Sequence, residues 1–591
     1  ESVTDIEIDK MLEGSEKLGT IGSPSTTSKL SLNLLGSATE KKLIGEIAVF
    51  TYKQDNEAHY ALGQITDMTL KNDLLQDSAF QAIARYTGSV KNISGIQDVH
   101  VASFSPSAVF SRNPDTGSFN QSILGTVPST GTPIFQASNK ILHKLLEEYK
   151  NLFYLGHAYG SKNLKVPMRF KHFGDGINGN QEAIHMGIFG ATGSGKSILA
   201  QRILMAYSRY NEMGLLVLDP AGQFTQDMME EDKTRKDTTD SDLNYKAILR
   251  SLGKEPIAIN VRNLVLDRWD LFKHILKHSS FFRILTVDKE NKSNAINFLI
   301  RILRKNNFRL ADLGERRSFN FVMENLRGEG NLSQIFSGKD GQKRLKERLS
   351  ADGLDEELYA IWDKVCTPFK RKEHGYTIEE LLVMFQHDKK PFVIVDLSNK
   401  SDLKLEYWNE TIQTLILIRL LSGLADLGEQ EYNNKKSLNT LVVLDEAHKW
   451  AGNRFENERH ENTELEGLKA RLIDYVRTTR KYRLGWMFIS TSLSSIDREI
   501  LQQLKIVFFG SGLSLGGDLQ RLKDMVPDDK AIDLYQSFGD PNNAPTRETK
   551  KFSFMCKGPV SPFSFSGFPL FFNAFSEKDF VKENSFQSVG E

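Results

Sequence analysis

The sequence predicts an α/β chain with a mostly parallel sheet, preceded by a small β-barrel and interrupted by a helical subdomain. Before residue 170, short strand-like segments alternate with polar turns, a pattern typical of a small barrel. After residue 182, several apolar runs are almost continuous, as in parallel strands buried on both faces. A charged helical stretch separates the early runs from the later ones. The 591 residues are too many for one hydrophobic core, so we expect several domains.

The N-terminal part divides into an arm and the barrel. Residues 1–40 are rich in Ser, Thr, Gly and Lys, which predicts a partly ordered, flexible arm with a helix over 6–18. The barrel is expected over 41–175, with a helix at 139–150. Its expected strands are 43–50, 60–65, 99–102, 122–127, 152–156 and 166–170.

The core is expected in two parts, 176–264 and 391–551, around a helical insertion at 265–390. Its expected strands are 185–189, 214–218, 391–395, 441–444, 485–489 and 505–509. Residues 552–591 form an aromatic tail, which either packs on the chain's own core or docks on a neighbouring subunit.

Composition excludes some classes of protein. Lys plus Arg equals Asp plus Glu at 76 each, so bulk charge does not indicate nucleic-acid binding, although a basic channel would leave it unchanged. Two cysteines and no CxxC pair fit a reducing cytoplasm. The apolar stretch 411–425 is broken by Gln413 and Arg419, so we expect a packed helix and no membrane span.

A phosphate-binding loop follows the strand at 185–189. The segment fits GxxxxGK[ST] between a strand and a helix, which predicts a RecA-like P-loop core that binds ATP and Mg²⁺. Lys196 would bridge the β- and γ-phosphates, and the Ser197 hydroxyl would hold Mg²⁺. The expected nucleotide-binding residues here are Gly190, Ala191, Thr192, Gly193, Ser194, Gly195, Lys196, Ser197 and Ile198.

Two acids end the strand at 441–444. Asp445 would orient a Mg²⁺-bound water, and Glu446 would polarise the attacking water. His448 has either a structural role or a role in coupling the γ-phosphate to the subunit edge. At the end of the strand 214–218, Asp219 and Gln223 would contact Mg²⁺ or water, unless the Asp-Pro turn only stops the strand.

Two further segments carry open alternatives. Ser492, after the strand 485–489, either senses the γ-phosphate or simply ends the strand. The basic cluster at 477–483 contains Arg477 and Arg480, which either neutralise transition-state charge in a neighbouring subunit's site or lie on a solvated face. A two-lobed DEAH helicase is excluded by the long gap between Lys196 and Glu446, and a small GTPase by the missing guanine-reading motif.

Taken together, these motifs resemble the HerA family of the HerA–FtsK superfamily. The resemblance rests on the P-loop Gly190–Ser197, Asp219-Pro220-Ala221-Gly222, Asp445-Glu446-Ala447-His448, and Arg480 to Gly485 before the next strand. It implies a homo-hexameric ring with ATP at subunit boundaries and double-stranded DNA in the pore. It also implies a partner on the barrel, either a nuclease or a sirtuin-like NAD-consuming subunit of an antiphage system. By the same resemblance, Arg480 is the best match to the family's arginine.

The chain departs from the family pattern at two site positions. Gln223 stands where the family usually has Glu, and the sensor strand ends in Thr491-Ser492 rather than Thr-Gln. The long insertion favours a defence-type member. Segments 452–464 and 511–519 are candidate pore loops. Two functions remain open: a DNA-translocating motor, or an ATP-gated ring that assembles and regulates its effector.

Overall fold

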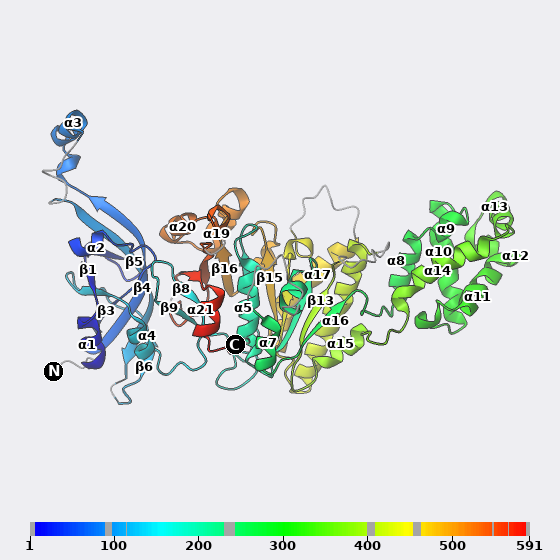
Figure 1. The fold of residues 1–591 in the computed structure, drawn as a ribbon, viewed down its shortest axis with the longest axis horizontal. Coiled ribbons are helices and arrows are strands. Elements are labelled where there is room, and N and C mark those ends of the chain that lie inside the picture. Colours follow the sequence, from blue (N-terminus) through cyan, green and yellow to red (C-terminus); the bar gives the residue numbers. More distant parts are fainter. Residues whose placement is uncertain are drawn as a thin grey trace.

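The computed structural model describes residues 6–88, 97–113, 115–229, 243–398, 408–452, 463–546, 549–564 and 567–586. The molecule is elongated (Figure 1). The barrel lies at one end, the large sheet with its helices in the middle, and the helical insertion at the other end.

The barrel is closed by six strands in the order β2-β1-β7-β3-β4-β5, with β5 pairing back to β2 and β6 added on the outside of β5. The strands are β1 (Lys17–Ile21), β2 (Leu30–Leu34), β3 (Ile47–Gln54), β4 (Glu57–Lys71), β5 (Val99–Arg112), β6 (Phe119–Ser122) and β7 (Pro133–Gln136). The prediction of a separate arm over 1–40 is therefore wrong for the described part, because Leu18, Leu30 and Leu32 are buried in the barrel. The expected strand 122–127 is also misplaced, since β6 ends at Ser122.

The barrel carries helices at both ends of its sequence. Helix α1 (Ile6–Glu13) packs against α4 (Asn139–Leu145), and α2 (Gly36–Thr39) follows β2. The β4–β5 pair extends beyond the barrel wall to η1 (Leu74–Gln76) and α3 (Ser78–Thr87), which project from the molecule (Figure 1).

The central sheet has eleven strands in the order β12-β13-β11-β14-β15-β10-β16-β17-β18-β8-β9. Its parallel part runs from β12 to β16: β12 (Pro256–Asn260), β13 (Phe392–Asp396), β11 (Gly214–Asp219), β14 (Thr440–Leu444), β15 (Leu484–Ser490), β10 (Met186–Phe189) and β16 (Ile506–Gly510). All six strands expected for the core are present. The half-buried edge strand β12 was not predicted.

The antiparallel extension of the sheet corrects two expected boundaries. It consists of β17 (Ser553–Lys557), β18 (Leu570–Ala574), β8 (Phe153–Ala158) and β9 (Lys165–Met168). Strands β8 and β9 therefore belong to this sheet and not to the barrel, because β8 pairs with the tail strand β18. In the tail, Phe563, Phe571, Phe572 and Phe575 are buried in the chain's own core, which is the first of the two predicted alternatives. Phe565 lies outside the described residues.

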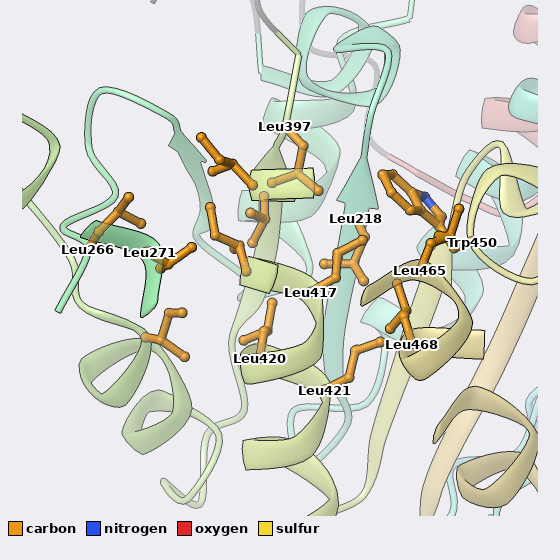
Figure 2. Close-up of a cluster of buried hydrophobic side chains, with 14 of the residues drawn as sticks. Leu218, Leu266, Leu271, Leu397, Leu417, Leu420, Leu421, Trp450, Leu465 and Leu468 are labelled. Carbon is orange, nitrogen blue, oxygen red and sulfur yellow. The ribbon is translucent and has the colours of Figure 1, made fainter. Parts of the chain in front are cut away.

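Helices cover both faces of the parallel strands. They are α5 (Lys196–Ser208), α6 (Gln223–Met229), α7 (Tyr245–Ser251), α16 (Glu410–Asn433), η5 (Ala447–Lys449), α17 (Thr463–Thr478), η7 (Thr479–Tyr482), α18 (Arg498–Gln503), α19 (Gly516–Met525), α20 (Asp529–Gln536), η8 (Pro541–Asn543) and α21 (Glu577–Glu583). Helix α16 is apolar and long enough to cross a membrane by length and composition. Here it packs as a core helix: Figure 2 shows Leu417, Leu420 and Leu421 of α16 beside Leu218 of β11 and Leu468 of α17.

The insertion is helical throughout, as predicted. It contains α8 (Trp269–His278), α9 (Phe281–Ile284), α10 (Lys289–Lys305), η3 (Leu310–Asp312), α11 (Arg316–Arg327), α12 (Glu329–Ile335), α13 (Lys339–Leu349), α14 (Leu354–Cys366), η4 (Thr367–Phe369) and α15 (Ile378–Met384). Its core surrounds Trp362, which is fully buried and donates its indole N–H to the Leu313 carbonyl at 2.6 Å. Figure 2 shows Leu266 and Leu271 where the insertion joins the sheet.

Candidate active site

The phosphate-binding loop connects β10 to α5 at the carboxyl edge of the parallel strands. Strand β10 lies between β15 and β16 and is parallel to both. Gly193 and Gly195 have φ angles of 84° and 87°, a region that only glycine adopts at little cost. The loop therefore places several backbone N–H groups at the N-terminus of α5, an arrangement that favours phosphate binding.

The side chains of the P-loop meet the second expected segment. The Lys196 ammonium donates to the Ala191 carbonyl at 3.0 Å, so it folds over the loop. The Ser197 hydroxyl lies 3.5 Å from the Gln223 amide oxygen. Burial lowers the pKa of Lys196, and the nearby carboxylates of Glu446 and Asp445 oppose that shift. The structure thus brings Lys196, Ser197, Gln223 and the two acids to one place, as the sequence predicts.

Two buried carboxylates lie side by side at the ends of β11 and β14. Leu218 of β11 is in register with Leu444 of β14, so Asp219 and Asp445 follow at neighbouring positions of the same edge. Asp219 is fully buried and accepts hydrogen bonds from Gln223 N at 3.1 Å and Thr225 N at 2.9 Å. Asp219 therefore holds the turn that carries Gln223, and a contact of either residue with Mg²⁺ or water stays a prediction.

Asp445 is a buried carboxylate beside two other acids, Glu446 and Asp219. Burial, with the charges of Glu446 and Asp219, raises the pKa of Asp445 to about 7. Desolvated carboxylates this close together are stabilised by a divalent cation. A hydroxyl (Ser197) and a carboxylate (Asp445) are oxygen donors of the kind that Mg²⁺ takes when phosphates and waters complete its shell. Within the described ranges, no group of three or more His, Cys, Asp or Glu side chains forms a metal cage.

Glu446 is held in an uncommon backbone conformation. Its φ and ψ of 48° and 44° lie in the left-handed region, where a non-glycine residue is strained. The His448 Nδ1 atom lies 3.3 Å from a Glu446 carboxylate oxygen. Burial lowers the pKa of His448, so this imidazole is neutral near pH 7 and does not cancel the charge of Glu446. The backbone of the residue that would polarise water is thus held in a defined conformation at the end of β14.

Ser492 lies at the same edge, just beyond the end of β15. Ser490, the last residue of β15, is in register with Phe189, which precedes the P-loop. The Ser492 hydroxyl donates to an Asp518 carboxylate oxygen at 2.8 Å, and the Ser494 N–H donates to the same oxygen at 2.6 Å. Ser492 is therefore beside the nucleotide site but engaged with α19.

Both candidate arginines lie at the opposite edge of the sheet. Arg480 precedes β15, and its carbonyl accepts the N–H of Ala183 just before β10. Its guanidinium lies 3.2 Å from Glu182. Arg477 pairs with Glu499, which precedes β16. Since a strand rises roughly 3.3 Å per residue, the length of β15 separates both arginines from their own P-loop by about 20 Å.

The C-terminal segment supplies two residues that the sequence did not indicate. A Cβ on Gly193 would lie 2.7 Å from the Asn542 side chain, and one on Gly195 would lie 2.6 Å from Phe552. Asn542 also approaches the Thr192 carbonyl at 3.4 Å. Asn542 and Phe552 therefore pack against the P-loop. A chain separation of 350 residues leaves no local signal for this contact.

The candidate pore loops are only partly described. Residues 453–462 of the first candidate lie outside the described residues. The second candidate, 511–519, connects β16 to α19 and begins helix α19, with Leu515 83% exposed. Ile198 lies in the first turn of α5 and is half-buried.

Comparison with known proteins agrees with this geometry. Residues 181–416 match the family model described as "Helicase HerA, central domain". No curated protein matches the chain. Among solved structures, VirB4 of Thermoanaerobacter pseudethanolicus is similar at 14% identity and a TM-score of 0.35, covering 73% of this chain and 98% of that chain.

Two other solved structures overlap with the chain. The bacterial conjugative coupling protein TrwBΔN70 has 12% identity, covers 74% of this chain and 92% of its own, and has a TM-score of 0.35. The genome packaging NTPase B204 of Sulfolobus turreted icosahedral virus 2, in complex with AMPPCP, has 7% identity, 66% and 98% coverage, and a TM-score of 0.28. At these scores we draw no conclusion from the structural likenesses. The family match shows that residues 181–416 form a HerA-type central domain, and the P-loop and the acidic pair make the chain a P-loop ATPase.

Proposed function

We propose that the chain is an ATP-driven double-stranded DNA translocase that works as a hexameric ring with an effector seated on the N-terminal barrel. The effector would be a nuclease or an NAD-consuming enzyme, and the setting would be antiphage defence in the cytoplasm. The alternative is an ATP-gated hexameric scaffold that regulates its effector without processive DNA movement.

The observation that supports a ring is the position of the arginines. Arg480 and Arg477 lie at the amino edge of the sheet, while the P-loop lies at the carboxyl edge of the same strands. An arginine that neutralises transition-state charge must reach the γ-phosphate. Neither can do so within its own subunit, whereas a ring would present the amino edge of one subunit to the carboxyl edge of the next.

The site residues have defined roles in hydrolysis. Lys196, released from the Ala191 carbonyl, would contact the β- and γ-phosphates. Ser197 and Asp445 would hold Mg²⁺, which would offset the negative charge of the phosphates. Glu446 would orient and polarise the attacking water through its fixed backbone.

The barrel and the insertion lie at opposite ends of the molecule (Figure 1), which favours separate binding roles for these two parts. A partner seated on the barrel end would leave the insertion uncovered.

Gln223 stands where a second carboxylate would add to the charge of Asp219 and Asp445, so we propose that the neutral amide limits repulsion at this site.

The first experiment is ATP turnover by the purified chain with and without linear duplex DNA. The Glu446→Gln variant is the matched control, because it keeps the shape of the site and removes the base. Turnover that rises with DNA and is lost in the variant supports the motor. Turnover that ignores DNA and is still lost in the variant rejects the motor and favours the scaffold.

A further inference from the structure

The insertion carries its positive charge unevenly. Residues 268–305, which span α8 to α10, contain nine lysines and arginines against three aspartates and glutamates, whereas the whole chain is balanced. Of the three acids, Asp270 pairs with Arg268 at 2.6 Å and Asp288 caps α10 through the Asn291 N–H. Glu290, in the first turn of α10, is the third. This part of the insertion therefore has a strong net positive charge.

Several cations elsewhere in the insertion are paired with acids. Arg327 pairs with Asp355 and Lys370 with Asp363, both at 2.6 Å, and Arg348 pairs with Glu357 at 3.5 Å. By contrast, no ion pair with a carboxylate is formed by Lys273, Lys277, Lys292 or Arg304 in the part of the chain that the structure describes. These four charges are thus left without a carboxylate partner among the described residues.

Two of these cations, Lys273 and Arg304, line a groove between α8 and α10, which pack against each other. Its hollow is lined by Trp269, Asp270 and Lys273 of α8 and by Asn297, Ile300, Arg301 and Arg304 of α10, and Asp270 is already paired with Arg268. Arg301 contacts the Gln334 amide oxygen, which carries no charge. We call this surface the α8–α10 groove.

Two further lysines, Lys277 and Lys292, belong to the same two helices. A helix rises about 1.5 Å per residue, so α8 spans about 15 Å, enough to follow several consecutive phosphates.

We propose that the α8–α10 groove binds the phosphate backbone of duplex DNA outside the pore of the ring. The side chains of Lys273, Arg301 and Arg304 match the negative charge of a polyanion. Contacts with phosphates carry no information about the bases, so binding is independent of DNA sequence. The groove is at the end of the molecule opposite the barrel, where a barrel-seated effector leaves it accessible (Figure 1). The inference rests on the proposed function, because the groove would be a second contact with the DNA that the ring translocates.

The test uses the full chain and a triple variant, Lys273→Ala, Arg301→Ala and Arg304→Ala. All three side chains are exposed, so the substitutions leave the fold intact. The matched control removes the same charge from exposed positions elsewhere in the insertion: Arg317→Ala, Lys339→Ala and Lys364→Ala. Affinity for fluorescent duplex DNA is measured by anisotropy over a range of salt concentrations, and basal ATP turnover confirms that the ring is intact.

We expect the triple variant to bind duplex DNA at least about tenfold more weakly, with the slope of log K against log salt reduced by about 2 to 3. The control keeps the wild-type affinity within about twofold. Basal turnover is unchanged in both. Equal losses in the two triple variants, or none in either, would overturn the assignment of the groove and point to an acidic protein as its partner.

Trp269 gives an independent readout. Trp362, Trp450 and Trp486 are fully buried, and Trp408 donates to the Leu397 carbonyl, whereas Trp269 lines the groove. DNA should change the tryptophan fluorescence of the wild type, and Trp269→Phe should remove that change. If the wild type fails to bind DNA at all, the proposed translocase fails as well. If the wild type binds and the groove variants bind equally, only the groove is rejected.

Discussion

Gln64 of the barrel and Phe571 of the C-terminal strand, 507 positions apart in the chain, form a pair of reciprocal hydrogen bonds. The Phe571 N–H donates to the Gln64 amide oxygen at 2.7 Å, and the Gln64 amide nitrogen donates to the Phe571 carbonyl at 2.9 Å. The same nitrogen donates to the Gly45 carbonyl at 2.8 Å. The Gln64 side-chain amide thus takes the place of a backbone peptide group and joins the barrel to the ATPase sheet. The Lys530–Asp67 ion pair at 2.8 Å reinforces this junction.

Gln64→Ala should loosen the junction between barrel and sheet. It leaves the Phe571 N–H and the Gly45 carbonyl without this partner in a buried place, at a cost of about 2 to 4 kcal/mol. We expect a lower unfolding temperature and faster release of the barrel in limited proteolysis. Gln81→Ala, on the exposed helix α3, is the control and should change neither. An unchanged proteolysis pattern in Gln64→Ala would mean that the junction is held by other contacts.

A role of Arg480 in the site of the neighbouring subunit can be tested by mixing two inactive variants. Lys196→Ala keeps Arg480 but loses the P-loop lysine, and Arg480→Ala has the reverse defect. If Arg480 acts on the neighbouring site, about a quarter of the boundaries in a randomly mixed ring are complete, so ATP turnover should exceed the sum of the two variants. Mixing Lys196→Ala with Glu446→Gln is the control, since both residues belong to one site. Turnover that stays additive in the first mixture would argue against a role for Arg480 across the boundary.

Gly193→Ala should weaken nucleotide binding. At a φ of 84° an alanine is strained by about 1 to 2 kcal/mol, and its Cβ would lie 2.7 Å from the Asn542 side chain. We expect at least about a tenfold loss of affinity for a fluorescent ATP analogue. Adding Asn542→Ala should recover only part of it, because the backbone strain remains.

Gly467→Ala is the matched control for Gly193→Ala. Gly467 lies in α17 with ordinary φ, and no described atom is within 4 Å of its added Cβ. It should bind nucleotide normally and be slightly more stable, because alanine favours a helix. If both variants bind equally well, the backbone conformation of Gly193 is not required for the site.

His185 should make the ATPase core less stable in mild acid. Burial lowers the pKa of His185 to about 4, against 6.5 in the unfolded chain, and its Nε2 lies 2.8 Å from the Val476 carbonyl. The unfolded state therefore binds more protons between these values, and stability falls as pH drops below 6.5. From pH 7.5 to 5.5 we expect a loss of about 1 kcal/mol, measured by urea unfolding.

His185→Gln should remove that loss, because glutamine does not titrate but can still donate to the Val476 carbonyl. His143→Gln, on the exposed side of α4, should behave as the wild type. A wild-type core equally stable at both pH values would show that His185 stays neutral in the unfolded chain or is charged in the folded one.

The nucleotide site was predictable because its chemistry is local. A strand, a glycine-rich turn and a helix in immediate succession produce the P-loop, and Asp445 and Glu446 directly follow a buried strand. Parallel strands bring their carboxyl ends to one edge, so Asp219, Asp445 and Ser492 were expected there. The strands of the core were predictable for the same reason, since burial on both faces leaves an unbroken apolar run.

The remaining features depend on contacts between distant segments. Strands β8 and β18 pair through backbone hydrogen bonds, which are the same for any side chains, so the sequence could not tell which sheet would take 153–158. Asn542 covers Gly193, and the α8–α10 groove exists only because two helices pack side by side. By itself the sequence determined the chemistry of the site and the order of the strands in the chain. The tertiary structure decided how the strands are arranged and how far Arg480 lies from its own P-loop, which is about the length of a strand. Packing and backbone pairing join segments that are far apart in the chain, so no local pattern predicts them.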